Sequence, residues 1–132
     1  MEKPCILIVE DHQDFLELLK HVANAEGCYP VAVEDCNKAI ELLKHVKPKI
    51  ISTDIMMPDT CGIDLINHVR NSPRLKDIPI LVISAAGEEA LTEAVDAGAT
   101  MVLRKPIDLC EFIRILREYV PAQARTGSHS SR

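Results

Sequence analysis

The sequence predicts an α/β protein built on an open, doubly wound parallel sheet of five strands. Two observations carry this prediction: short apolar runs recur along the chain, and the stretches after them have helical periodicity. The runs are CILIV (5–9), PVAV (30–33), KIIS (49–52), ILVIS (80–84) and MVL (101–103). Strands that are apolar almost throughout and alternate with helices indicate a parallel sheet covered on both faces. Five strands are too few for a closed eight-stranded barrel, so an open sheet is expected.

A helix is predicted after each strand, because apolar residues three and four positions apart share one face of a helix. In chain order these faces are Phe15, Leu18, Leu19 and Val22; Ile40, Leu43 and Val46; Leu65, Ile66 and Val69; Leu91, Ala94 and Val95; and Leu109, Phe112, Ile113 and Leu116. Residues that interrupt regular structure separate the elements, namely Gly27, Pro48, Pro73, Pro79 and Gly98.

Length and composition favour one globular domain over residues 1–120. The chain has 132 residues, of which 47% are apolar, and its net charge of −5 is not that of a protein which binds nucleic acid or an anionic membrane. It has no apolar run long enough to span a membrane and no signal peptide, so a cytoplasmic protein is expected. The small, polar and aperiodic segment PAQARTGSHSSR (121–132) is expected to be a disordered tail, in part a cloning remnant.

The five cysteines are an odd number without C-x-x-C spacing, which favours reduced thiols over a disulfide framework or a zinc site. Cys61 stands out because it lies in the loop that follows Asp54.

Charged and hydroxyl side chains follow four of the five strands. In open parallel sheets, ligands bind outside the carboxyl ends of the strands, so these side chains are expected to share one edge. They are Glu10 and Asp11 after the first strand, Asp54 after the third, Ser84 at the end of the fourth, and Lys105 after the fifth.

This set of side chains predicts a Mg²⁺ site beside a phosphoryl site. Clustered carboxylates repel one another unless a cation lies among them, and oxygen ligands favour Mg²⁺. The hydroxyl and the ammonium supply hydrogen-bond donors to phosphate oxygens. Asp54 can then attack phosphorus and become an aspartyl phosphate.

The chain resembles a response-regulator receiver domain of two-component signalling, of the chemotaxis-regulator type, from about Pro4 to Val120. The resemblance rests on four motifs in order: VED (9–11), TDIMMPD (53–59), ISAAG (83–87) and LRKPID (103–108). It implies a flavodoxin-like sheet of strand order 2-1-3-4-5 with five helices. It also implies a cis peptide bond between Lys105 and Pro106.

The same resemblance assigns roles to the site residues. Asp54 would be the phosphoacceptor, with Ser84 and Lys105 as the hydroxyl and the lysine of the site. Mg²⁺ would be held by Asp11, Asp54 and the backbone carbonyl of Met56, with Glu10 acting through water.

The implied function is a signalling module that changes conformation and partner binding when a phosphoryl group reaches Asp54. The donor would be a sensor histidine kinase or a histidine phosphotransfer protein. The only catalytic activities of the module itself would be self-phosphorylation and autodephosphorylation. Neither nucleic acid nor a membrane is expected as a direct partner, and the sequence does not name the downstream effector. A second VED motif (33–35) follows an edge strand in this strand order, so Glu34 and Asp35 are expected to be solvated loop charges.

Two positions depart from the family pattern. Val102 stands where receivers usually carry an aromatic residue that changes rotamer with phosphorylation, and valine has a stiff side chain with no ring to rebury. Thr60 and Cys61 replace the commoner methionine and acidic pair before Gly62.

Alternative interpretations remain for the chain and for single residues. A receiver fold can serve as an interaction module without phosphorylation, and Val102 keeps this alternative open. An aspartyl-phosphate phosphohydrolase is a weaker alternative, because Met56 occupies the position of the second aspartate in haloacid-dehalogenase-like enzymes. A nucleotide-binding Rossmann domain is not supported, because no glycines follow the first strand. Asp54 alone could cap a helix, and His12 is interpreted as a residue at a helix start rather than a metal ligand.

Overall fold

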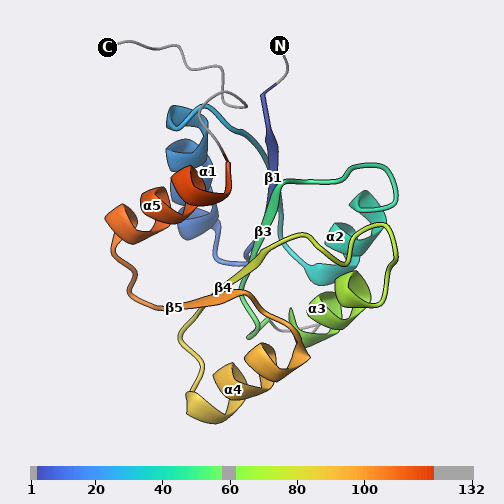
Figure 1. Ribbon diagram of the computed structural model, residues 1–132. Helices are drawn as coiled ribbons and strands as arrows, with labels where there is room; N and C mark the ends of the chain where they lie inside the picture. The colour runs from blue at the N-terminus through green and yellow to red at the C-terminus, as the bar shows by residue number, and fades with distance from the viewer. Residues whose placement is uncertain (1–2, 58–61, 121–132) are drawn as a thin grey trace.

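Five strands and five helices alternate along residues 3–57 and 62–120, the part of the chain that the computed structural model describes (Figure 1). The strands are β1 (Cys5–Val9), β2 (Tyr29–Val33), β3 (Ile50–Thr53), β4 (Ile80–Ser84) and β5 (Met101–Arg104). The helices are α1 (Gln13–Ala25), α2 (Cys36–Leu42), α3 (Gly62–Arg70), α4 (Glu88–Ala97) and α5 (Leu109–Tyr119). The predicted alternation is confirmed, and the ends of every strand agree with the apolar runs to within one residue.

All four strand pairings are parallel, in the order β2-β1-β3-β4-β5, which confirms the predicted sheet. The register matters for function because it aligns the carboxyl ends of neighbouring strands. Val9 of β1 pairs with Thr53 of β3, so the residues that follow them, Glu10 and Asp54, leave the sheet side by side. Ser84 of β4 pairs with Arg104 of β5, which places Lys105 at the same edge.

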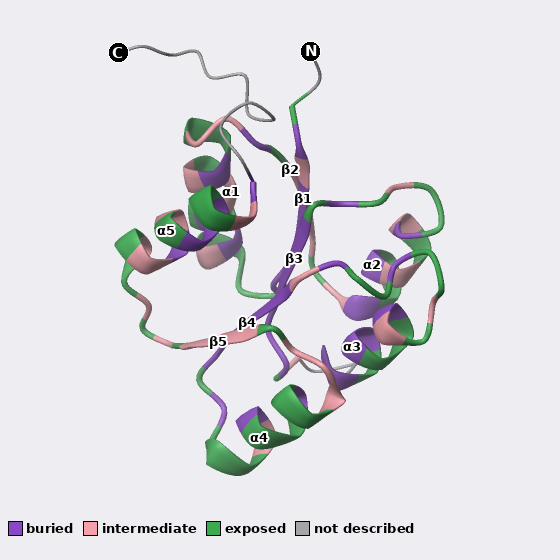
Figure 2. Ribbon diagram, in the orientation of Figure 1, coloured by how far each residue is buried: buried purple, intermediate pink, exposed green. Residues whose placement is uncertain are grey.

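Helices cover both faces of the sheet, and alternate strand residues face the two layers. In β1, Ile6 and Ile8 belong to the core that α1 and α5 cover, while Leu7 and Val9 belong to the core under α2, α3 and α4. Figure 2 shows the resulting pattern, with buried strands at the centre and helices that are exposed on their outer sides. The central strands β1, β3 and β4 are buried, which explains why their sequences read as unbroken apolar runs, whereas the edge strands β2 and β5 are half-buried.

Helix α2 is shorter than its apolar pattern predicts. The structure ends it at Leu42, with Leu43 as its C-cap, so Val46 lies outside the helix. The last turn tightens, because the amide of His45 donates to the carbonyl of Leu42 at 2.9 Å. The guanidinium of Arg74 donates to the carbonyl of Leu43 and thereby satisfies an acceptor at the helix end that a longer helix would have used.

Two apolar residues that were predicted to face the core are exposed instead. Leu18 in α1 is 41% exposed and Val95 in α4 is 52% exposed. Each lies at the border of its apolar face, where periodicity alone does not distinguish core from surface. Both border hollows of the surface that are described below.

The second VED motif has a structural role that the sequence did not predict. Asp35 is the N-cap of α2, and its carboxylate accepts a hydrogen bond of 2.8 Å from the amide of Lys38. Glu34 is exposed, as expected for a loop charge.

Some predictions fall on residues outside the described ranges, namely the tail 121–132 and the loop positions Thr60 and Cys61. Within the described ranges, no helix has the length and apolar character needed to cross a membrane.

Candidate functional site

Asp54 lies directly after β3 and is almost completely buried, with 5% of its surface exposed. Its amide donates to the carbonyl of Val9, which ties the end of β3 to the end of β1. Its carboxylate oxygen Oδ1 accepts a hydrogen bond of 3.0 Å from the amide of Met56. Met56 is not in a helix, so this bond is not a helix cap, and the alternative of a capping aspartate is wrong. The side chain of Met56 is well exposed beside the carboxylate.

Three carboxylates meet at this edge of the sheet, as the sequence predicts. One oxygen each of Glu10, Asp11 and Asp54 lie within 4.8 Å of one another. Glu10 is buried at 2% exposure, whereas Asp11 faces solvent. The backbone amide of His12, the N-cap of α1, donates to Glu10 Oε2 at 3.0 Å and fixes that carboxylate; His12 therefore lies at a helix start, as predicted. Such a group of oxygen ligands can hold a divalent cation.

Lys105 carries the positive charge closest to this cluster. Its Nζ lies 2.8 Å from Asp54 Oδ2 and 3.1 Å from Glu10 Oε1, while about a quarter of the lysine side chain is exposed (24%). The peptide bond between Lys105 and Pro106 is cis, as the resemblance implies.

Burial and the neighbouring charged groups shift the pKa values of Glu10 and Lys105 in opposite directions. Burial raises the pKa of Glu10, and the hydrogen bonds from His12 and Lys105 offset only part of that rise. Burial also acts to lower the pKa of Lys105, but the hydrogen bonds to Asp54 and Glu10 outweigh it, so its pKa lies above the ordinary value. One ammonium therefore faces three carboxylates, and the site has spare negative charge for a cation.

Ser84 ends β4 and is completely buried. Its carbonyl accepts a hydrogen bond of 3.0 Å from the amide of Lys105, so the hydroxyl-bearing residue and the lysine are joined through the backbone. Its hydroxyl oxygen accepts a hydrogen bond of 3.1 Å from the amide of Ala86. This bond holds the start of the β4–α4 loop in place. A hydroxyl that accepts this bond can also donate its proton to another group.

Gly62 is a further requirement of the site that the sequence analysis missed. A Cβ atom at this position would lie 2.4 Å from the carbonyl oxygen of Asp54 and 2.7 Å from the Cα of Ile55. Only glycine allows the first turn of α3 to approach the backbone behind Asp54 this closely. The sequence offers no sign of this constraint except a glycine at the start of a helix.

Val102 lies on β5 and is half-buried, between the sheet and α4. It borders a shallow hollow of about 370 Å³ that is lined by Glu88, Leu91, Thr92, Val95 and Arg104 as well. The guanidinium of Arg104 donates to both carboxylate oxygens of Glu88 across this hollow. The acidic face of α4 that includes Glu88 is exposed.

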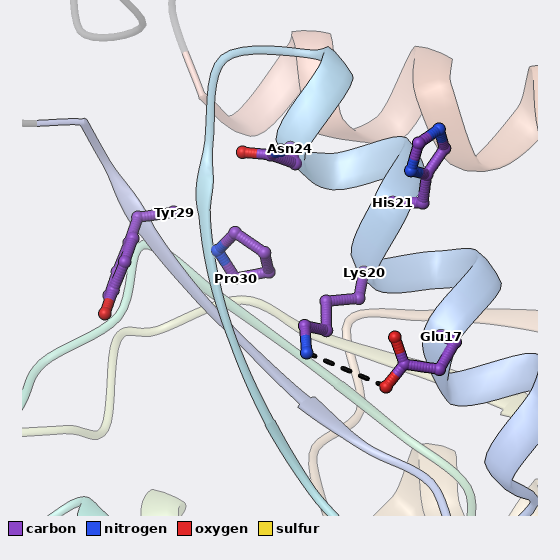
Figure 3. Close-up of a pocket in the computed structure, with 6 residues that line it drawn as sticks. All are labelled: Glu17, Lys20, His21, Asn24, Tyr29 and Pro30. Atoms are coloured by element: carbon purple, nitrogen blue, oxygen red, sulfur yellow. Dashed lines mark ion pairs between the residues drawn. The ribbon is translucent and has the colours of Figure 1, made fainter.

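A second hollow, of about 640 Å³, lies between α1 and the start of β2, at the amino ends of the strands (Figure 3). Lys20 and Glu17 form an ion pair of 3.7 Å at its edge, and Tyr29 and Pro30 form its other side. This hollow does not include any of the predicted site residues, which lie at the carboxyl ends of the strands.

Comparison with known proteins identifies the family to which this fold and cluster belong. The family described as "Response regulator receiver domain" matches residues 6–117. A receiver protein from Pseudomonas putida, titled "response regulator receiver protein", has a similar structure, with a TM-score of 0.82, 26% identity, and coverage of 89% of this chain and 98% of that chain.

Two curated proteins are similar in sequence. An uncharacterised 14.6 kDa protein of Leptolyngbya boryana is 33% identical over 115 residues, which cover 86% of this chain and 88% of that protein. The regulator of RpoS of Escherichia coli strain K12 is 38% identical over 128 residues, which cover 96% of this chain but 36% of that protein. The chain thus spans about a third of the length of the second relative. The family match extends over most of the sequence and includes four strands of the sheet in full and all but the first residue of β1, and the chain therefore belongs to the response regulator receiver domains of two-component signalling.

Proposed function

We propose that residues 1–120 form a receiver domain that accepts a phosphoryl group on Asp54 and changes its binding to partners as a result. The observation that carries this proposal is the arrangement around Asp54: a buried carboxylate lies against the ammonium of Lys105 and beside two further carboxylates. A carboxylate that only stabilised the fold would need one partner, whereas this one lies in a cluster with excess negative charge.

The proposed reaction begins with a phosphohistidine of a sensor histidine kinase or a histidine phosphotransfer protein. An oxygen of Asp54 attacks phosphorus, the bond between phosphorus and the imidazole nitrogen breaks, and that nitrogen keeps the bonding electron pair. Lys105 donates a hydrogen bond to a phosphoryl oxygen, because its Nζ already contacts the attacking carboxylate. Ser84 donates its hydroxyl proton to another phosphoryl oxygen.

Mg²⁺ fits the donor set, since the three side chains of the cluster all offer carboxylate oxygens and Mg²⁺ prefers a few carboxylates together with water and phosphate oxygens. Asp11, Asp54 and the backbone carbonyl of Met56 would hold it, with Glu10 bound through water. When bound, the cation neutralises charge that develops on the phosphoryl oxygens. The chain contributes a Glu10 carboxylate that is fixed by the His12 amide and therefore does not need to reorganise.

Labelling with a small acyl phosphate tests the proposal. The parent protein is expected to acquire one acid-stable, base-labile phosphoryl group only in the presence of Mg²⁺. Asp54→Asn should acquire none, while Asp35→Asn, which alters a carboxylate that caps α2 and does not belong to the cluster, should label like the parent. Equal labelling of Asp54→Asn and the parent would show that the acceptor has been assigned wrongly.

A receiver that binds partners without phosphorylation is the second candidate, and Val102 is the observation that favours it. Valine at this position leaves β5 without the aromatic side chain that would change rotamer with phosphorylation. Partner capture that is identical for the phosphorylated parent and for Asp54→Asn would support this candidate.

A further inference from the structure

The ammonium of Lys105 is held from two directions. On one side it donates to carboxylate oxygens of Asp54 and Glu10. On the other side it lies 5.0 Å from the centre of the Phe15 ring. This separation is within the range of about 6 Å over which an aromatic face attracts a cation. The chain has only two phenylalanines and no tryptophan, and one of those two rings contacts the site lysine.

The position of Phe15 is fixed by the same segment that supplies the acidic pair. Helix α1 begins directly after Glu10 and Asp11, with His12 as its N-cap, so Phe15 lies in the first turn of the helix. The ring is half-buried and packs against the core between α1 and α5. The backbone that carries the ring is therefore continuous with the backbone that carries the acidic pair.

The surroundings of the ring strengthen its attraction for the ammonium. Phe15 and Lys105 line one groove of about 390 Å³, whose other walls are His12, Leu18, Pro106, Ile107 and Leu109. Most of these side chains are apolar, and 24% of the Lys105 side chain is exposed, so the lysine has lost part of its contact with water. A cation that has lost part of its water shell interacts more strongly with an aromatic face than a fully solvated cation does.

We propose that Phe15 is a positioning residue for Lys105, whose ring keeps the ammonium at the acidic cluster so that it is in place when the phosphoryl group arrives. This inference rests on the proposed function, because the lysine acts on a phosphoryl group at Asp54. Leucine could fill the same space in the core but would exert no attraction on a cation. The aromatic ring is therefore the feature that matters.

The ring becomes more important during the reaction than before it. Bond formation to phosphorus uses one oxygen of Asp54, and the charge that holds Lys105 is redistributed over the phosphoryl oxygens. The contact with Phe15 does not change, because the ring takes no part in the reaction. A lysine has a long flexible side chain, so a fixed second contact reduces the number of orientations it can adopt.

Two substitutions at Phe15 separate an attraction by the ring from simple packing. Phe15→Leu keeps an apolar side chain, and we expect it to slow labelling by a small acyl phosphate at saturating Mg²⁺ about two- to fivefold. Phe15→Tyr keeps an aromatic face and should label at the parental rate. The small donor removes any contribution of the groove to the binding of a protein partner. Leu18→Ala, which alters the same helix and the same groove, serves as the control and should not change the rate.

The decisive comparison repeats Phe15→Leu in a protein that also carries Lys105→Met. If the ring acts through the lysine, Phe15→Leu should cause no further slowing there. Equal slowing in both backgrounds, or Phe15→Tyr as slow as Phe15→Leu, would overturn the inference and leave a structural role.

A measurement without phosphorylation keeps the inference separate from the proposed function. The ¹⁵N NMR signal of the Lys105 ammonium in the parent should show slow exchange of its protons with water, and Phe15→Leu should accelerate that exchange. An unchanged ammonium signal in Phe15→Leu would overturn the inference. Failure of the parent to label, with the exchange effect present, would instead contradict the proposed function while the positioning role stands.

Discussion

Replacing Lys105 with methionine should destabilise the protein in a way that Mg²⁺ reverses. The substitution keeps most of the apolar side chain and removes the charge that faces Asp54 and Glu10. At most 6% of either side chain is exposed, so the variant would hold two charges away from water without a cation. Breaking a fully buried pair by removing one partner costs about 3–5 kcal/mol. Because the lysine is partly exposed and water can screen its charge, we expect a loss of about 2 kcal/mol in the free energy of unfolding.

Chemical denaturation with and without Mg²⁺ measures this effect. In a chelator at pH 7, the variant should unfold at a lower denaturant concentration than the parent. A ligand that binds only the folded state at one hundred times its dissociation constant adds about 2.7 kcal/mol of stability, so excess Mg²⁺ can offset the whole loss. The variant should also bind Mg²⁺ at least as tightly as the parent, because the ammonium no longer competes for Asp54 and Glu10.

The pH dependence of the free energy of unfolding tests the same prediction independently. Burial raises the pKa of Glu10, so its folded state binds a proton more tightly than its unfolded state. Stability from this group is therefore present at low pH and is lost as the pH rises through the raised pKa. Without Lys105 that loss should be larger. The difference in the free energy of unfolding between Lys105→Met and the parent should therefore grow from acidic to neutral pH.

A surface pair provides the matched control. Lys44 forms an exposed ion pair with Glu41, and Lys44→Met should change stability by no more than about 0.5 kcal/mol, with or without Mg²⁺. The reasoning fails if Lys105→Met is as stable as the parent in chelator, or if it loses its affinity for Mg²⁺.

Three further predictions concern the lifetime of the phosphoryl group, the conformational change around Val102 on phosphorylation, and the contribution of Arg70 to stability. The aspartyl phosphate should be long-lived, because neither Met56 nor Ala86 can orient a hydrolytic water. Met56→Asn should shorten the half-life of the aspartyl phosphate about tenfold. A rapid-quench decay assay that finds no acceleration in this variant would refute the prediction. Met56 is the cleaner site for this test, since it is exposed whereas Ala86 is buried. Hydrogen exchange with and without a phosphoryl mimic should show small changes around Val102, and broad changes over residues 86–105 would show a conventional switch. Arg70→Met should lower the free energy of unfolding, measured by urea denaturation, by about 2–3 kcal/mol, because the guanidinium donates to the carbonyls of Gly98, Lys76 and Ile78. Labelling of Asp54 should persist in this variant, since these contacts lie at the amino ends of β4 and β5.

Apolar periodicity predicted the sheet well because the central strands β1, β3 and β4 are buried, the edge strands β2 and β5 are half-buried, and each helix buries one face. The runs at 5–9 and 80–84 coincide with β1 and β4, and Phe112 and Leu116 are buried in α5 as their spacing predicts. The same signal fails where a distant residue decides the outcome. The end of α2 depends on a hydrogen bond from Arg74, which lies 31 positions away from Leu43 in the chain. No local pattern contains that information.

The sequence allowed us to predict which residues of the site share one edge of the sheet, but not the atomic contacts that hold them in place. Strand order places Glu10, Asp54 and Lys105 together, and the structure brings these three side chains into direct contact. Two supporting features could not be predicted: the close approach of Gly62 to the backbone of Asp54, and the ring of Phe15 beside Lys105. Both depend on where a helix begins relative to a strand end, and this distance of a few ångströms is set by the packing of the whole domain.

The charge balance of the site explains why these features belong together. Three carboxylates lie within reach of one another, two of them buried, and a single ammonium partly neutralises them. Such a cluster costs stability, and a chain that needed only to fold would be better served by apolar residues there. The cost becomes useful if the missing positive charge is supplied by a cation that also binds phosphate oxygens. The same imbalance that destabilises the folded chain would then attract Mg²⁺ and make the position of Lys105 sensitive to the charge that Asp54 carries. The groups that hold that lysine are therefore where phosphorylation should first change the structure.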